Sequence, residues 1–214
     1  MYFLRKRKVR FLQISNSSIA CYDPAETDQL KKFIVATGLL NHIWQSWNQF
    51  WRAYWIAYII GGQDLQNRKI VPLCSNLSEP EALYYLLTLI GKKKKDSMGS
   101  IRSSHEESVT WGNLKTIQDL AAQIQSLSPT SNVSNALNAA SLFGMTIEHF
   151  QTIRNSQIHI STSNMNKLRS VVPYYLISSK PKYPHEIIEA RELSSGKIAI
   201  RAWVENMNNF LTYL

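Results

Sequence analysis

The stretch IWQSWNQFWRAYWIAYII, residues 43–60, carries four of the six tryptophans of the chain. These are Trp44, Trp47, Trp51 and Trp55, at intervals of three, four and four residues. Because an α-helix turns once every 3.6 residues or so (about 100° per residue), this spacing places all four indoles on one helix face. An aromatic stripe of this kind is typical of a packed core or a subunit interface. The stretch therefore predicts a long helix that buries its tryptophans.

The same stretch does not predict a membrane span. Polar residues interrupt it at Gln45, Asn48, Gln49 and Arg52, and a span needs about 20 predominantly apolar residues. The first fifteen residues, MYFLRKRKVRFLQIS, are basic but lack the apolar run of a signal peptide. Cys21 and Cys74 are too few for a disulfide framework. We expect a protein of the reduced cytoplasm with no membrane partner.

Residues on both sides of the tryptophan stretch mark where its helix should begin and end. Asp23 can cap its start and Pro24 suits its first turn. Gly61-Gly62 would end it after Ile60, and a break near Gly38 is one option in a helix of that length.

Further helices are expected on both sides of polar and proline-rich segments. SEPEALYYLLTLI (78–90) has Ser78 or Glu79 before Pro80 and ends at Gly91, and Thr146 can cap a helix that begins at Ile147. The remaining expected helices are 113–127, 132–143, EIIEAREL (186–193) and KIAIRAWVENMNNFLTYL (197–214).

The predicted fold is all-α, a helical bundle with a small extended or β N-terminal arm. Short β-branched and aromatic runs around a polar NSS turn suggest a hairpin or an extended arm over residues 1–22. Residues 23–214 would form one helical domain. Within it, residues 91–112 have four lysines directly after Gly91 and are rich in serine, which indicates an exposed basic loop.

The charge points to an anionic partner. Lysine and arginine number 24 against 15 acids, a net charge of +9, which favours nucleic acid first and a membrane surface second. Two clusters are dense in positive charge, Arg5 to Arg10 and the run Lys92, Lys93, Lys94 and Lys95. Each could bind RNA phosphates as substrate-binding residues, or could be a solvated surface.

Most common catalytic motifs are missing from the sequence. It has no glycine-rich phosphate loop, no His-Glu-x-x-His, no Gly-x-Ser-x-Gly and no paired carboxylates for a two-metal nuclease. We therefore expect no cofactor and no metal.

The segment RNSQIH, residues 154–159, holds what RNA cleavage without a metal needs. The imidazole of His159 can move a proton because its ordinary pKa is about 6.5. Arg154 can hold the scissile phosphate and stabilise the charge that grows on it, while Asn155 orients either group. The RNA supplies its own nucleophile, the 2′-hydroxyl. The alternative is a polar helix face that only meets solvent.

The spacing of five residues constrains such a site. On a regular helix Arg154 and His159 lie about 140° apart and do not share a face. They can meet if the backbone departs from a straight helix, or if two copies face each other across a two-fold axis.

RNSQIH in a late helix of an all-helical chain resembles the HEPN superfamily, whose signature is Arg-x4–6-His with a polar second residue, often Asn. The resemblance implies a dimeric bundle of four or more helices with the motif in the dimer cleft. It implies a metal-independent endoribonuclease that acts as a toxin or in antiviral abortive infection, held in check by an antitoxin partner. Arg154 would then bind phosphate, Asn155 would orient it and His159 would be catalytic.

Two other interpretations stay open. The chain could be a catalytically silent HEPN subunit that pairs with a nucleotidyltransferase or another protein. It could also be a helical nucleic-acid-binding module in which Arg154 only holds phosphate.

Overall fold

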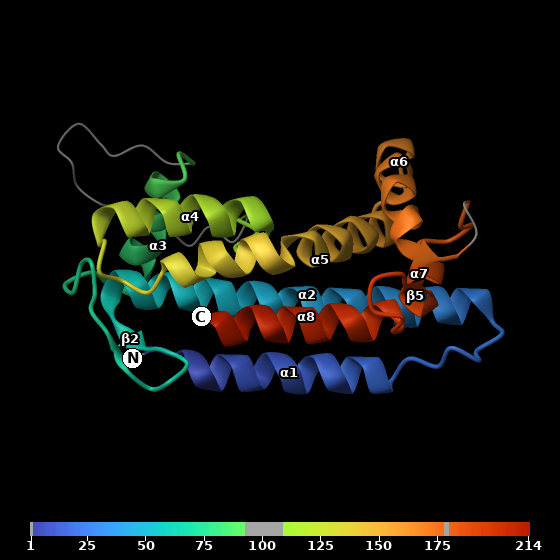
Figure 1. Cartoon of the computed structure of the whole chain (residues 1–214), viewed down its shortest axis with the longest axis horizontal. Coiled ribbons are helices and arrows are strands. Elements are labelled where there is room, and N and C mark those ends of the chain that lie inside the picture. The colour runs from blue at the N-terminus through green and yellow to red at the C-terminus, as the bar shows by residue number, and fades with distance from the viewer. Residues whose placement is uncertain (1, 93–108, 178–179) are drawn as a thin grey trace. The chain divides into compact units, whose positions relative to one another are not determined.

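The computed structural model describes residues 2–92, 109–177 and 180–214, and in this part the chain is mainly helical (Figure 1). The helices are α1 (Leu4–Ala20), α2 (Gln29–Ile60), α3 (Glu79–Leu89), α4 (Leu114–Leu127), α5 (Ser134–Ile158), α6 (Thr162–Val171), the short 3-10 helix η1 (Val172–Tyr174), α7 (Glu186–Glu189) and α8 (Ala199–Tyr213). The strands are β1 (Tyr2–Phe3), β2 (Gly62–Gln63), β3 (Lys69–Ile70), β4 (Tyr175–Leu176) and β5 (Arg191–Glu192). The expected all-α bundle with a small β segment at the N-terminus is confirmed.

The chain divides into two compact units. Unit 1 contains Met1–Arg10, Trp47–Leu142 and Phe210–Leu214, and unit 2 contains Phe11–Ser46 and Phe143–Asn209. The helices α1, α2, α5 and α8 each contribute residues to both units.

The tryptophan stripe is core, as predicted. Trp47, Trp51 and Trp55 are fully buried in unit 1, where the rings of Trp51 and Trp55 stack with their centroids 5.2 Å apart. Trp44 belongs to unit 2 and stacks on Phe150 of α5 at 5.9 Å. Full burial of one large aromatic side chain contributes on the order of 2 to 3 kcal/mol, so the stripe is a major source of stability in both units.

The helix α2 begins later than the sequence suggested and runs without a break. Asp28 caps it, because its carboxylate accepts the backbone N–H groups of Leu30 and Lys31 at 2.9 and 3.2 Å. Asp23 instead closes a local turn in the preceding segment. Gly38 lies inside the helix, and the end after Ile60 was predicted correctly, since Gly61 has a φ of 95°.

The prediction of a hairpin or extended arm over residues 1–22 was wrong beyond the first strand. Only Tyr2–Phe3 is a strand, and the following residues form the helix α1. Leu4, Phe11 and Ser15 are buried and recur with helical spacing. The exposed basic residues between them break up the apolar pattern, which is why the short runs looked like strands.

Two expected helices are one. We predicted helices over 132–143 and from Ile147, but α5 passes through Gly144 and Thr146 without interruption. Thr146 is buried and accepts a hydrogen bond from Asn206 of α8 at 3.1 Å instead of capping a helix. Tertiary packing therefore overrides the local signals here.

The helix predicted over 78–90 is confirmed as α3. Ser78 precedes it, and the Glu81 carboxylate accepts both the backbone N–H and the hydroxyl of Ser78, at 2.8 and 2.6 Å. The helix ends at Leu89, and Gly91 follows shortly after it with a φ of 70°.

The expected exposed loop over 91–112 is wrong at its end. Trp111 is buried, and Gly112 accepts a hydrogen bond from the Trp47 indole at 2.8 Å. Most of the remaining loop lies outside the described residues.

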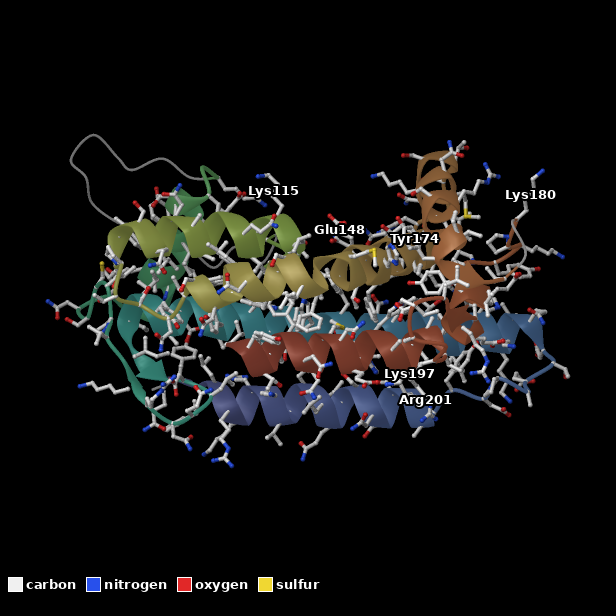
Figure 2. All side chains as sticks on the ribbon, viewed as in Figure 1. Lys115, Glu148, Tyr174, Lys180, Lys197 and Arg201 are labelled. Carbon is white, nitrogen blue, oxygen red and sulfur yellow. The ribbon has the colours of Figure 1, made fainter. Side chains whose placement is uncertain are left out.

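The expected closing helix over 197–214 is confirmed as α8. Lys197, labelled in Figure 2 beside Arg201, precedes this helix and forms an ion pair with Glu205 at 2.6 Å. The helix expected over 186–193 was only partly right, since α7 ends at Glu189 and the backbone then extends into β5, which pairs with β4.

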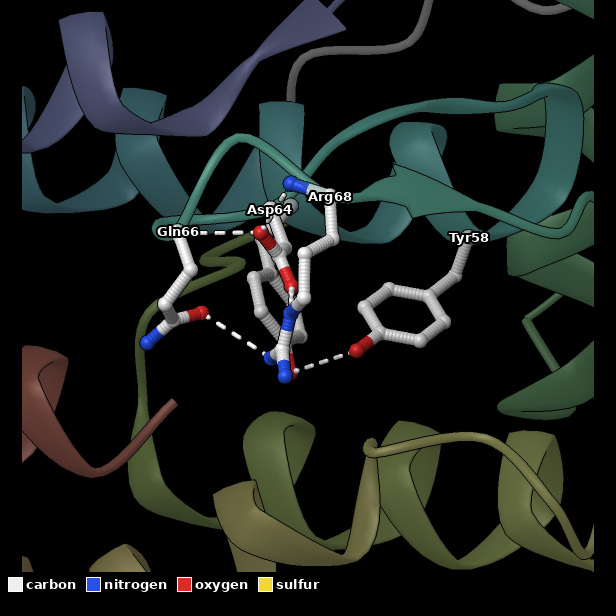
Figure 3. Close-up of polar contacts among 5 residues, drawn as sticks. Tyr58, Asp64, Gln66 and Arg68 are labelled. Carbon is white, nitrogen blue, oxygen red and sulfur yellow. Dashed lines mark hydrogen bonds and ion pairs between the residues drawn. The ribbon is translucent and has the colours of Figure 1, made fainter.

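A small sheet in unit 1 holds the start of the chain. The strand β2 pairs in parallel with β1 and antiparallel with β3. The turn between β2 and β3 is closed by Asp64, whose carboxylate accepts the backbone N–H groups of Gln66 and Arg68 at 2.8 Å and the side chain of Arg68 at 2.7 Å (Figure 3). This network fixes β2, and β2 in turn positions Tyr2 and Phe3.

Candidate functional site

The predicted site lies at the end of α5, where Arg154 is held by two asparagines. Its Nε donates to Oδ1 of Asn41 at 3.0 Å and its Nη1 donates to Oδ1 of Asn155 at 3.0 Å. The guanidinium is half-buried, and this burial lowers the pKa of Arg154 from its ordinary value. Arginine still carries its charge at neutral pH. A guanidinium has five N–H groups, so these two bonds leave donors that could meet a phosphate.

Asn41 reaches Arg154 because α2 and α5 run antiparallel in unit 2. Nε2 of Gln157 donates to the carbonyl oxygen of Phe33 and to the hydroxyl of Thr37, both at 3.2 Å. Further along α2, Asn41 meets Arg154, and then Trp44 meets Phe150. This register decides which face of α5 turns toward α2.

His159 lies immediately after the last residue of α5 and is exposed. Its backbone N–H donates to the carbonyl oxygen of Asn155 at 2.8 Å, as in a regular helix. Its own carbonyl oxygen accepts Nδ2 of Asn164 at 2.7 Å. Ser161 then caps α6 by accepting the backbone N–H of Asn164 at 3.2 Å. The turn between the two helices therefore fixes the backbone of His159 while its ring meets solvent.

The structure brings Arg154 and Asn155 together but does not bring His159 to them. The helical hydrogen bond to the N–H of His159 shows that α5 does not bend before this residue. Arg154 faces α2, and the helix geometry puts His159 about 140° away from it. In the described part of the chain no contact joins the two side chains.

Two of the residues between Asn155 and His159 serve the fold. Ser156 is fully buried, and its hydroxyl lies 2.8 Å from the carbonyl oxygen of Thr152 and 3.0 Å from that of Asn164. Gln157 is also buried, against α2.

Of the predicted lysine run, Lys92 is exposed after the end of α3. Lys93, Lys94 and Lys95 lie outside the described residues. The sequence reasoning did not find Asn41, which is separated from Arg154 by 113 residues. A signal was available, since Asn41 is a polar residue on the face of a helix that otherwise carries Thr37 and Trp44 toward the core.

A buried histidine forms a separate network in unit 2. Nδ1 of His149 lies 2.8 Å from the hydroxyl of Tyr175, which also accepts Nε1–H of Trp203 at 2.9 Å. The Tyr175 hydroxyl therefore links His149 to Trp203. Burial lowers the pKa of His149 and so favours the neutral ring.

Other possible sites have fewer reactive or ligand-binding side chains. Residues 2–92, 109–177 and 180–214 contain no group of three or more His, Cys, Asp or Glu side chains placed to hold a metal ion. None of their helices combines the length and apolar character that crossing a membrane requires. A hollow of about 760 Å³ in unit 2 lies between α1 and α8, with Asn16, Arg201 and Glu205 in its lining.

Comparison with protein-family models, with curated proteins and with solved structures gives no match to this chain.

Proposed function

We propose that this chain is a metal-independent endoribonuclease of HEPN type, with Arg154, Asn155 and His159 in its active site. One observation carries the proposal: the end of α5 presents an exposed His159 within two turns of an arginine that two asparagines hold in place. These are the groups that phosphodiester cleavage through the 2′-hydroxyl needs.

Arg154 is suited to bind the scissile phosphate. Asn41 and Asn155 each fix one side of the guanidinium, so less side-chain entropy is lost when a phosphate binds. Its partial burial strengthens the attraction to an anion, because the surrounding dielectric is lower than that of water. As the 2′-oxygen attacks phosphorus, the remaining donors stabilise the added negative charge.

His159 is suited to move the proton. The 2′-oxygen loses its proton to an imidazole and forms a bond to phosphorus, while the bond from phosphorus to the 5′-oxygen breaks and that oxygen takes up a proton. The products are a 2′,3′-cyclic phosphate and a 5′-hydroxyl. An exposed imidazole can either accept or give up a proton, so His159 can serve in either direction.

The proposal includes a second copy of the chain. Arg154 and His159 lie on different faces of a helix that does not bend before His159. A two-fold axis close to the end of α5 would instead set Arg154 of one copy opposite His159 of the other, and the reverse. The cleft would then hold two arginines and two histidines as two composite sites, each with Arg154 of one copy and His159 of the other.

A cytoplasmic toxin or antiviral defence effector, restrained by an antitoxin partner, is the role we propose for this activity, by analogy with the superfamily. The second candidate is a silent subunit or a nucleic-acid-binding module, favoured by the two hydrogen bonds that already occupy Arg154.

The test is cleavage of end-labelled RNA in the presence of EDTA. Wild-type protein should release fragments with cyclic phosphate ends, and His159→Ala should lose about a hundredfold or more in rate. The matched control is His42→Ala, since His42 is also exposed and belongs to the same unit.

RNA that wild-type protein binds but leaves intact would overturn the nuclease and support the binding module. Equal losses in His42→Ala and His159→Ala would remove His159 from the mechanism.

A further inference from the structure

A hollow of about 520 Å³ lies at the start of α1, in unit 1. We call this hollow the N-terminal basic pocket. Its lining residues are Tyr2, Phe3, Lys6, Arg7, Arg10 and Glu79. The volume falls in the range of ligand-binding sites, about 300 to 1,000 Å³. The pocket contains three cationic side chains and one carboxylate, so its net positive charge favours an anionic ligand.

The one carboxylate of the pocket is already engaged. Glu79 forms an ion pair with Arg52 at 2.9 Å and a hydrogen bond with the hydroxyl of Tyr2. Burial, followed by this bond, raises the pKa of Tyr2, so its hydroxyl stays protonated. The cations of the pocket take part in none of the ion pairs found among the described residues.

The three cations share one face of α1. Arg10 is four residues after Lys6 and three after Arg7, and these spacings bring helical side chains together. All three are exposed, whereas Leu4 and Phe11 of the same helix are buried at 1%. The helix is therefore attached by its apolar side and directs its basic side outward.

This arrangement works against the stability of the helix. The N-terminal end of a helix carries a partial positive charge, so each cation in the first turn is unfavourable. Arg5, Lys6 and Arg7 all lie in or next to the first turn of α1, which contains no acid. A bound anion would relieve this repulsion, and departures of this kind from local rules are typical of functional sites.

The pocket is also held in place. The strand β1 pairs in parallel with β2, with Tyr2 opposite Gly62 and Phe3 opposite Gln63. Phe3 is 37% exposed, and the ammonium of Lys6 lies 5.0 Å from the centroid of its ring. An apolar ring face and a positive charge therefore lie side by side in a fixed position.

We propose that the N-terminal basic pocket binds single-stranded nucleic acid, with phosphates at Lys6, Arg7 and Arg10 and a base against Phe3. Cations that follow the backbone beside an aromatic ring are the general means of binding single strands without sequence preference. The pocket and the proposed cleavage residues belong to different units, so this binding does not depend on cleavage.

A membrane surface is the competing anionic partner. A helix that lies in a membrane interface inserts an apolar face, but Leu4 and Phe11 on that face of α1 are packed inside the protein. The exposed apolar side chains here are Phe3 and Val9, which fall short of the continuous apolar face that an inserted helix needs.

The test measures binding of a fluorescent, 2′-O-methylated RNA strand of about ten nucleotides by anisotropy, since a methylated 2′-oxygen cannot start the cleavage proposed above. Arg7→Gln/Arg10→Gln should raise Kd about tenfold or more and reduce the salt slope by about 1.4, because a single-strand phosphate contact contributes about 0.7. Phe3→Leu should raise Kd about fivefold or more without a change in the slope, since stacking is lost and no charge is.

The matched control is Lys167→Gln/Arg169→Gln. It also removes two exposed positive charges, and neither residue lines the pocket. Its Kd should stay within about twofold of wild type.

If both double variants weaken oligonucleotide binding equally, the effect comes from net charge alone and the proposed site is overturned. Unchanged binding by Arg7→Gln/Arg10→Gln would also overturn it. If that variant fails to fold, unchanged binding by Phe3→Leu overturns it. Pocket-dependent binding to phosphatidylserine vesicles, without binding to the oligonucleotide, would overturn it in favour of a membrane.

Discussion

Replacement of Gly62 by alanine should detach the N-terminal strand. A Cβ at this position would lie 2.7 Å from the carbonyl oxygen of Tyr2, 3.0 Å from the Cβ of Ala57 and 3.2 Å from the Cβ of Tyr2. None of these atoms belongs to the end of a flexible side chain, so none can swing aside. The parallel pairing of β1 with β2 would have to open.

The expected loss is moderate. Overpacking of this kind costs about 1 to 3 kcal/mol. A change of 1 kcal/mol moves the melting temperature of a domain of 150 to 250 residues by about 2 to 4 °C, so Gly62→Ala should melt about 2 to 12 °C below wild type.

Gly38→Ala is the control of opposite sign. Gly38 lies inside α2, and apart from its chain neighbours and the helix backbone around it, no atom of the described residues would be within 4 Å of its added Cβ. Alanine in a helix interior is favoured over glycine by about 0.5 to 1 kcal/mol, so this variant should melt at or above the wild-type temperature.

Two measurements on the same samples check the reasoning. Thermal melts followed by circular dichroism give the stabilities, and anisotropy with the methylated RNA strand gives binding. Gly62→Ala should also bind more weakly, because β1 holds Phe3 and the start of α1. A Gly62→Ala variant that melts with wild type would refute the pairing of β1 with β2.

The remaining predictions concern pH and the candidate site. Burial lowers the pKa of His149 and of His185, so below about pH 6.5 the unfolded chain binds protons that the folded chain does not. The urea midpoint should therefore be constant above neutral pH and fall below it, and a His149→Asn variant with an unreduced pH dependence would count against this network as a source. Asn41→Asp would place a carboxylate beside Nε of Arg154, so RNA cleavage should fall about tenfold or more through competition with phosphate. Activity that Asn41→Asp leaves at the wild-type level would show that Arg154 does not bind the scissile phosphate.

The regular parts of the fold could be predicted from the sequence because their signals are local. The tryptophan spacing indicated a buried face of α2, and Ser78 or Glu79 before Pro80 marked the start of α3. Each signal lies within a few residues of the element that it specifies.

Errors arose where distant residues decide the structure. Thr146 has the form of a helix cap, but Asn206 of α8 engages its hydroxyl and α5 continues. Asp23 and Asp28 are both possible caps of α2, and only the backbone path selects Asp28. Local chemistry does not distinguish between such alternatives.

The relative positions of the candidate site residues were predicted in part. The sequence indicated Arg154, Asn155 and His159 as candidates. It also predicted that Arg154 and His159 lie on different faces of a straight helix, and the unbent end of α5 agrees with this. It could not reveal Asn41, because the contact with Arg154 depends on the register between α2 and α5. That register is fixed by packing that spans more than a hundred residues of sequence.

The composite active site is the central claim, and a mixing experiment tests it most directly. Arg154→Ala and His159→Ala should each be inactive on labelled RNA in EDTA. After the two variants are mixed and allowed to exchange subunits, half of the dimers are mixed, and each mixed dimer has one intact pair of Arg154 and His159. Activity should return to about a quarter of the wild-type value. A mixture that stays as inactive as its components, although mixed dimers form, would contradict a site shared between two chains.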